Sequence, residues 1–155
     1  MNYRIERVEK DDLPFLGKFI HSAKLALSIN RLLYLNWPNE ELQRPNSPLL
    51  AEINNAVNEI GKETEEMDRF EITYMCVKPT AQRKGIGSRL VQLGFDRAKA
   101  WGIPLKVCAE APSIPFFTSI GFVETRHVNI DLGKYAADNS GFGIFRHSGM
   151  IWCPE

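Results

Sequence analysis

The residues best suited to chemistry stand between a strand-forming run and a helix-forming run, in the segment Lys78–Ser88. A glycine-rich turn that leads into a helix presents unpaired backbone N–H groups and the positive end of the helix dipole. Gly85 and Gly87 leave room for a bulky phosphate to approach the backbone, the basic pair before them adds positive charge, and Ser88 adds a hydroxyl. The segment therefore predicts a site for a phosphate-bearing ligand.

Two well-known phosphate motifs do not fit this segment. A P-loop needs Gly-Lys-Ser/Thr after an earlier glycine, and a dinucleotide fingerprint needs a third glycine three residues after Gly87, where Leu90 stands. The simpler alternative is a solvated loop whose glycines only make a tight turn. A strand before the loop, a helix after it and a second strand at crossover distance favour the phosphate site.

The segment resembles motif A of the GCN5-related N-acetyltransferases, Gln/Arg-x-x-Gly-x-Gly/Ala, which here runs from Gln82 to Gly87. The preceding Val77-Lys78-Pro79 matches too, and Pro115–Phe122 is similar to the Tyr-x-x-x-Gly-Phe signature that ends the family's short helix. The resemblance covers about Phe70–Phe122.

This resemblance implies an α/β (α+β) fold: a mixed, mostly antiparallel sheet with a splayed parallel strand pair and flanking helices. It implies acetyl-CoA as co-substrate, with loop amides on the pyrophosphate and backbone groups of the strand on the pantetheine arm. The positions that correspond to these contacts are Met75, Val77, Gln82, Arg83, Lys84, Gly85, Ile86, Gly87 and Ser88. The expected activity is direct acetyl transfer to an amine of a small molecule or peptide.

Acyl transfer to an amine requires a base for the nucleophile and a proton for the leaving thiolate. Glu71, eleven residues before Gln82, stands where the resemblance places a general base, and an exposed acid on a half-buried strand is the alternative reading. Glu110 is the competing candidate, as base or in ordering water or substrate. The family's usual acid is a tyrosine at the position of Phe117, which cannot donate a proton but is expected to line the co-substrate site. A CoA-binding domain without transfer activity therefore stays open.

The elements that must position these residues have clear signals. Phe70–Val77 is rich in β-branched and aromatic residues and predicts a strand, and Leu105–Ala109 predicts another. Between them, helical spacing from Ile86 to Trp101 ends at Gly102-Ile103-Pro104. A short helix near 114–120 and two strands, 123–132 and 143–152, which could pair as a hairpin, complete the expected order.

The first half of the chain has weaker signals. Tyr3–Val8 alternates as a strand does, and a helix follows to about Ser28. Ser47-Pro48 predicts the start of a helix that ends at Gly61. Residues 30–69 otherwise read as loop and helix, so the sheet could lack the family's usual second and third strands.

The composition of the chain limits its possible domain organisation, partners and location. The 155 residues suit one domain, 1–155, with 44% hydrophobic and 25% charged residues. Nineteen basic residues balance nineteen acidic ones, which argues against nucleic-acid and membrane partners. The absence of a signal-like segment favours the cytoplasm. The three cysteines and three histidines lack ligand spacing, so no metal is expected, and the oligomeric state stays open, a homodimer included.

Overall fold

The computed structural model describes residues 47–136, 138–139 and 141–155. The expected strand Tyr3–Val8 and the helix after it lie outside the described residues. The main elements are α3 (Ser47–Gly61), β1 (Phe70–Ile72), α4 (Ile86–Trp101), β2 (Leu105–Glu110), α5 (Ile114–Ser119), β3 (Val123–Asp131) and β4 (Ile144–Trp152). Short 3-10 helices connect several of them: η3 (Lys62–Thr64), η4 (Pro79–Ala81), η5 (Ala111–Ser113) and η6 (Leu132–Tyr135).

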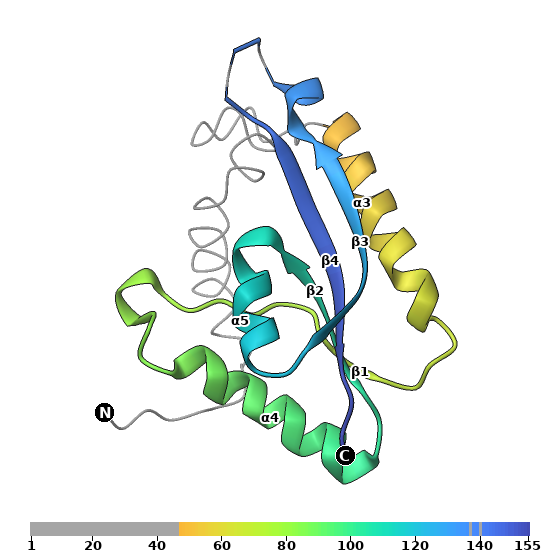
Figure 1. Cartoon of the computed structure of the whole chain (residues 1–155), viewed down its shortest axis with the longest axis vertical. Coiled ribbons are helices and arrows are strands. Elements are labelled where there is room, and N and C mark those ends of the chain that lie inside the picture. The colour runs from red at the N-terminus through yellow and green to blue at the C-terminus, as the bar shows by residue number, and fades with distance from the viewer. Residues whose placement is uncertain (1–46, 137, 140) are drawn as a thin grey trace, which may run out of the picture.

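The described strands form one mixed sheet in the order β1-β2-β4-β3. β1 pairs with β2 in parallel, as expected for two strands joined through a helix, and the β2/β4 and β3/β4 pairs are antiparallel. The long hairpin of β3 and β4 runs the length of Figure 1 beside α3. The expected mixed, mostly antiparallel fold class is confirmed.

The strand β1 is shorter than its sequence predicts. The expectation was a strand over Phe70–Val77, whereas the ladder with β2 ends at the pair Ile72↔Val107, and β2 continues to Glu110 paired with β4. Strand preference is local, but a strand also needs a hydrogen-bonding neighbour. Past Ile72 the chain leaves β2, so the two parallel strands separate toward their C-terminal ends.

Helix α4 matches its predicted bounds because both ends carry local signals. Gly85 precedes its first residue and Gly102 follows its last, each with positive φ, and the Gly102 amide bonds back to the carbonyls of Ala98 and Lys99. Helix α3 likewise spans the expected residues. Residues 47–69 contain only α3, η3 and irregular chain before β1, while 30–46 lie outside the described part.

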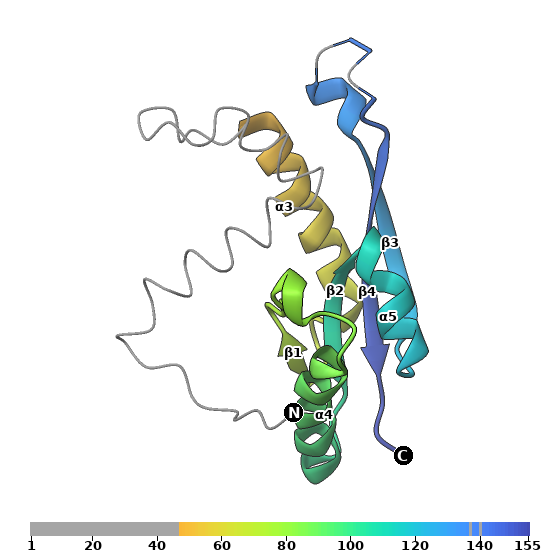
Figure 2. The ribbon, with the colours of Figure 1, turned by 90° about the vertical axis from the view of Figure 1, so that its left-hand side faces the viewer.

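Helices cover both faces of the sheet, with α3 on one side of β4 and α5 on the other (Figure 2). One buried cluster joins α4 and α5 to the sheet: Val91, Phe95, Ala98, Leu105, Val107, Ala109, Phe117, Phe122 and Met150. A second cluster packs α3 against the far half of the β3/β4 hairpin: Leu49, Ala56, Ile130, Leu132 and Phe145. Because side chains alternate along a strand, the even-numbered residues of β2 face away from the first cluster.

Candidate functional site

The loop that enters α4 has the backbone shape of an anion cradle. Arg83 (φ 61°) and Gly85 (φ 77°) are both left-handed, and Gly85 gives the helix no side-chain cap. The first bond of the helix runs from Arg89 N to Gly85 O at 3.1 Å. The amides of residues 86–88 belong to the first turn, where an α-helix has no internal acceptor for them. The loop therefore places N–H donors that have no acceptor within the helix at the positive end of α4.

Two side chains of the loop are used to hold its own backbone. Gln82 Nε2 donates to Val77 O at 3.1 Å, and Lys84 Nζ donates to Thr80 O at 3.0 Å. These exposed bonds brace the turn around η4. The Lys84 ammonium still lies beside the helix entrance, where its charge favours an anion.

The two glycines of the motif have different neighbours. A Cβ on Gly85 would meet no atom of the described residues within 4 Å, so only its positive φ demands glycine, and these residues leave space beside it for a ligand. A Cβ on Gly87 would lie 3.4 Å from Cζ of Phe116 and 4.0 Å from Cγ2 of Val77. The phosphate-approach argument thus fits Gly85, whereas Gly87 is packed against an aromatic ring.

The segment between β1 and the loop carries the two residues expected along the pantetheine arm. Met75 and Val77 are both half-buried, and Met75 packs against the core cluster of α4 and α5. Val77 reaches Gly87, so this segment runs alongside the first turn of α4. The structure therefore brings together the strand segment, the loop residues and one residue of α5.

Phe117, expected to line the co-substrate site, is 4% exposed and sits in the core. Its ring is 5.3 Å from that of Phe122 and 5.1 Å from that of Phe116, measured between centroids. Phe116 is the α5 side chain that reaches α4, and sequence reasoning missed it because only the second phenylalanine aligns with the family's tyrosine.

The two candidate catalytic carboxylates lie on the sheet face opposite the α4 cluster. Glu71 is paired in register with Lys106, its side chain is 42% exposed, and Oε2 lies 3.9 Å from Arg69 Nε. Glu110 ends β2, four residues beyond Lys106, which is about 13 Å along a strand. The two carboxylates therefore occupy separate positions, one among the parallel β1/β2 pairs and one beyond them, where β2 is paired with β4.

Two further titratable residues stand on this face. Burial raises the pKa of the Cys108 thiol to about 11, while Lys106 lowers it and Glu71 raises it by smaller effects. His147 pairs in register with Glu110, is 9% exposed, and has its pKa lowered by burial. The alternation of β4, read from the sequence, could have placed His147 on this face but not beside Glu110.

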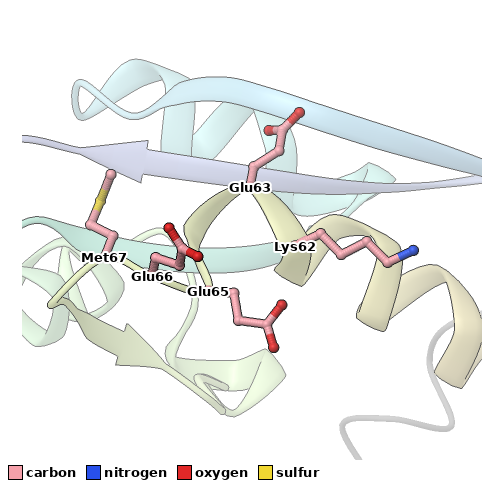
Figure 3. A pocket seen from close by; sticks show the side chains of 5 residues that line it. All are labelled: Lys62, Glu63, Glu65, Glu66 and Met67. Atoms are coloured by element: carbon pink, nitrogen blue, oxygen red, sulfur yellow. The ribbon is translucent and has the colours of Figure 1, made fainter.

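A cleft of about 580 Å³ lies at the segment that joins α3 to β1. Figure 3 shows its five lining side chains: Lys62, Glu63, Glu65, Glu66 and Met67. The cleft is distinct from the anion cradle, and Arg69 links its segment to Glu71 of β1. Its Nη1 donates to the carbonyl of Met67 at 3.1 Å and to that of Thr64, within the same segment.

The described residues contain neither a candidate metal-binding group nor a candidate membrane-spanning helix. In that part of the chain, no group of three or more His, Cys, Asp or Glu side chains is arranged to hold a metal ion. Among the helices described, none is long and apolar enough to cross a membrane.

Comparisons with known proteins bear on the family and the fold. Residues 46–124 match the acetyltransferase (GNAT) domain, a span that contains α3, the cradle and α5. Among solved structures, the chain resembles a GCN5-related N-acetyltransferase from Rhodopseudomonas palustris that is also described as an aminotransferase, class II. The TM-score is 0.50 at 14% identity, over 94% of this chain and 92% of that one, which supports the fold alone. No curated protein sequence matches.

Proposed function

Because the chain belongs to the GNAT acetyltransferase family, we propose that it transfers the acetyl group of acetyl-CoA directly to a primary amine of a small molecule or peptide. The observation that carries this proposal is the cradle at the start of α4, next to the point where β1 leaves β2. Uncapped amides and a left-handed glycine beside open space fit the pyrophosphate of CoA, which supplies the activated acetyl group.

The residues that would bind the co-substrate follow from this placement. The amides of Ile86, Gly87 and Ser88 would hold the pyrophosphate, with the exposed Arg83 beside them. Beyond Ile72, the chain that has left β2 would offer its backbone groups to the pantetheine arm, along Met75 and Val77. The thioester would then reach the level at which the parallel strands separate.

Once the acceptor amine is positioned at the thioester, the reaction needs only a group that accepts a proton and a source that donates one. The acceptor nitrogen forms a bond to the acetyl carbon while the carbon–sulfur bond breaks, the nitrogen loses one proton and the departing thiolate gains one. Glu71 would accept the nitrogen's proton through a water molecule. Its half-exposed carboxylate faces the side of the sheet away from α4, where water can reach it. With Phe117 buried in the core, solvent or a hydroxyl such as that of Ser113 or Thr118 would protonate the thiolate.

Thiol release from acetyl-CoA, measured against a panel of small amines and peptides, tests the proposal. We expect amine-dependent release by the wild-type chain. Glu71→Gln is expected to lose the acidic limb of the pH–rate profile with unchanged affinity for CoA, and an unaltered profile would remove Glu71 from the role of base. The cytoplasm, where acetyl-CoA and reduced thiols are both available, is the proposed location, in keeping with the three free cysteines.

A second candidate is a CoA-binding domain that performs no transfer. The observation that favours it is the buried phenyl ring of Phe117 at the position of the family's acid. Calorimetry separates the two functions: tight CoA binding without thiol release on any acceptor supports the second, whereas turnover supports the first.

A further inference from the structure

Two cationic side chains with unused hydrogen-bonding capacity flank Glu71. The first is Lys106, which is opposite Glu71 in the β1/β2 register and only 4% exposed. Its backbone belongs to the ladders with β1 and β4, but its side chain makes neither a hydrogen bond nor an ion pair with the described residues. Its ammonium group nevertheless lies close enough to influence the Cys108 thiol, as Glu71 also does. Lys106, Cys108 and Glu71 therefore form one local group of side chains.

The second cation is Arg69, two residues before Glu71 along the chain. Its Nη1 is occupied by the carbonyls of Thr64 and Met67, but its Nε is buried and has no hydrogen-bond acceptor among the described residues. The nearest carboxylate oxygen, Oε2 of Glu71, is 3.9 Å away, which is too far for a hydrogen bond. The guanidinium is thus held in place through Nη1, while its buried Nε–H is left unsatisfied.

Leaving the buried Nε–H of Arg69 without an acceptor is costly. Arg69 and Lys106 carry two positive charges against the single carboxylate of Glu71, so the group has an excess of positive charge and of donors. An anion that accepts hydrogen bonds from both cations would satisfy them. A carboxylate has the two acceptor oxygens that such a pair of donors requires.

We infer that Arg69 and Lys106 bind a carboxylate that the acetyl acceptor carries next to its amine, so that the acceptor is an amino acid or a closely similar zwitterion. The inference rests on the proposed acetyl transfer. Neighbouring strands lie about 4.8 Å apart, and one carbon separates the amine from the carboxylate in an α-amino acid. With its carboxylate on the two cations, the acceptor would present its amine to Glu71.

The cleft beside Arg69 provides space for the remainder of the acceptor. It is built on the segment whose carbonyls hold the Arg69 guanidinium, and its acidic lining (Glu63, Glu65 and Glu66) suits a neutral or positively charged side chain better than a negative one. The carboxylate and the side chain of the acceptor would then occupy two different sub-regions.

Matched acceptors test this subsite. Each amino acid is compared with the amine that remains when its carboxylate is removed, for example leucine with 3-methylbutylamine. The wild-type chain is expected to favour the amino acid by about tenfold or more in kcat/KM, the range expected for one charge-assisted hydrogen bond. Lys106→Met should remove this preference while leaving the KM for acetyl-CoA unchanged, and Lys106→Arg should retain it. Lys134→Met, an exposed lysine on η6, is the matched control.

Two results would overturn the subsite. In the first, the wild-type chain has equal kcat/KM for the amino acid and its matched amine. In the second, Lys106→Met loses kcat/KM equally for both. A binding measurement tests the carboxylate subsite independently of the transfer reaction. Thermal stabilisation by a panel of N-acetyl amino acids, present in the wild-type chain and absent from Lys106→Met, would support the subsite even if no acceptor released thiol. Lack of stabilisation by every member of the panel would reject it.

Discussion

The ring of Phe116 lies directly against Gly87, so that a Cβ on Gly87 would be 3.4 Å from Cζ and 3.7 Å from Cε2 of the ring. This contact joins α5 to the first turn of α4. One side of the proposed pyrophosphate site is therefore fixed by a residue almost thirty positions further along the chain. The relationship explains why glycine suits position 87 although its φ is not positive.

Enlarging position 87 should displace Phe116 and disturb the cradle. We expect Gly87→Val to weaken CoA binding about tenfold, because the added methyl groups overlap the ring and shift the first turn of α4. Phe116→Ala in the same chain should restore most of the affinity, since it removes the overlapping atoms. A double-mutant cycle measured by calorimetry checks this coupling. Strictly additive effects of the two substitutions would contradict it.

The neighbouring glycine should respond to a different property of the replacement. Gly85 has a φ of 77° and open space around its missing Cβ, so conformation and charge matter there while volume does not. Gly85→Asp is expected to weaken acetyl-CoA binding by more than tenfold because it places a negative charge beside the pyrophosphate. Gly85→Asn, which has nearly the same shape and tolerates left-handed backbone, is the control and should bind much better. Equal affinities for the two variants would argue against an anion at this turn.

The features that the sequence predicts well are those with local causes. Helix α4 has the predicted bounds because a left-handed glycine stands at each end, and α5 follows from the short run before Gly121. The parallel β1/β2 pair also follows, because a strand, a helix and a second strand in close succession leave few other arrangements.

The features that the sequence does not predict depend on distant partners. The strand β1 ends at Ile72 because its neighbour diverges, which no local preference for β structure can indicate. Phe116 reaches the cradle while Phe117 faces the core, a distinction set by the direction of α5 against the sheet. The unused donors of Arg69 and Lys106 appear only when two strands and the segment from Thr64 to Met67 are assembled.

Helix α3 should depend on a close approach to the sheet at Gly149. A Cβ there would lie 2.5 Å from Cγ2 of Ile60, a distance at which one group must move. Gly149→Ala is expected to lower the free energy of unfolding by about 1 to 3 kcal/mol through overpacking. Combining it with Ile60→Ala, which removes the opposing atoms, should give less destabilisation than the sum of the two single substitutions. Chemical denaturation of the four proteins measures this, and additivity would show that α3 can move away freely.

The buried imidazole of His147 should make stability depend on pH. Burial lowers its pKa in the folded chain relative to the ordinary value of 6.5, so the unfolded chain binds more protons as the solution becomes acidic. The contribution of His147 to stability is therefore complete above about pH 6.5 and declines as the pH falls below that value toward its folded pKa. His147→Gln, which does not titrate, should flatten the decline between pH 7 and pH 5. Urea denaturation across this range is the measurement, and parallel curves for the wild-type chain and His147→Gln would show that the imidazole titrates alike in both states.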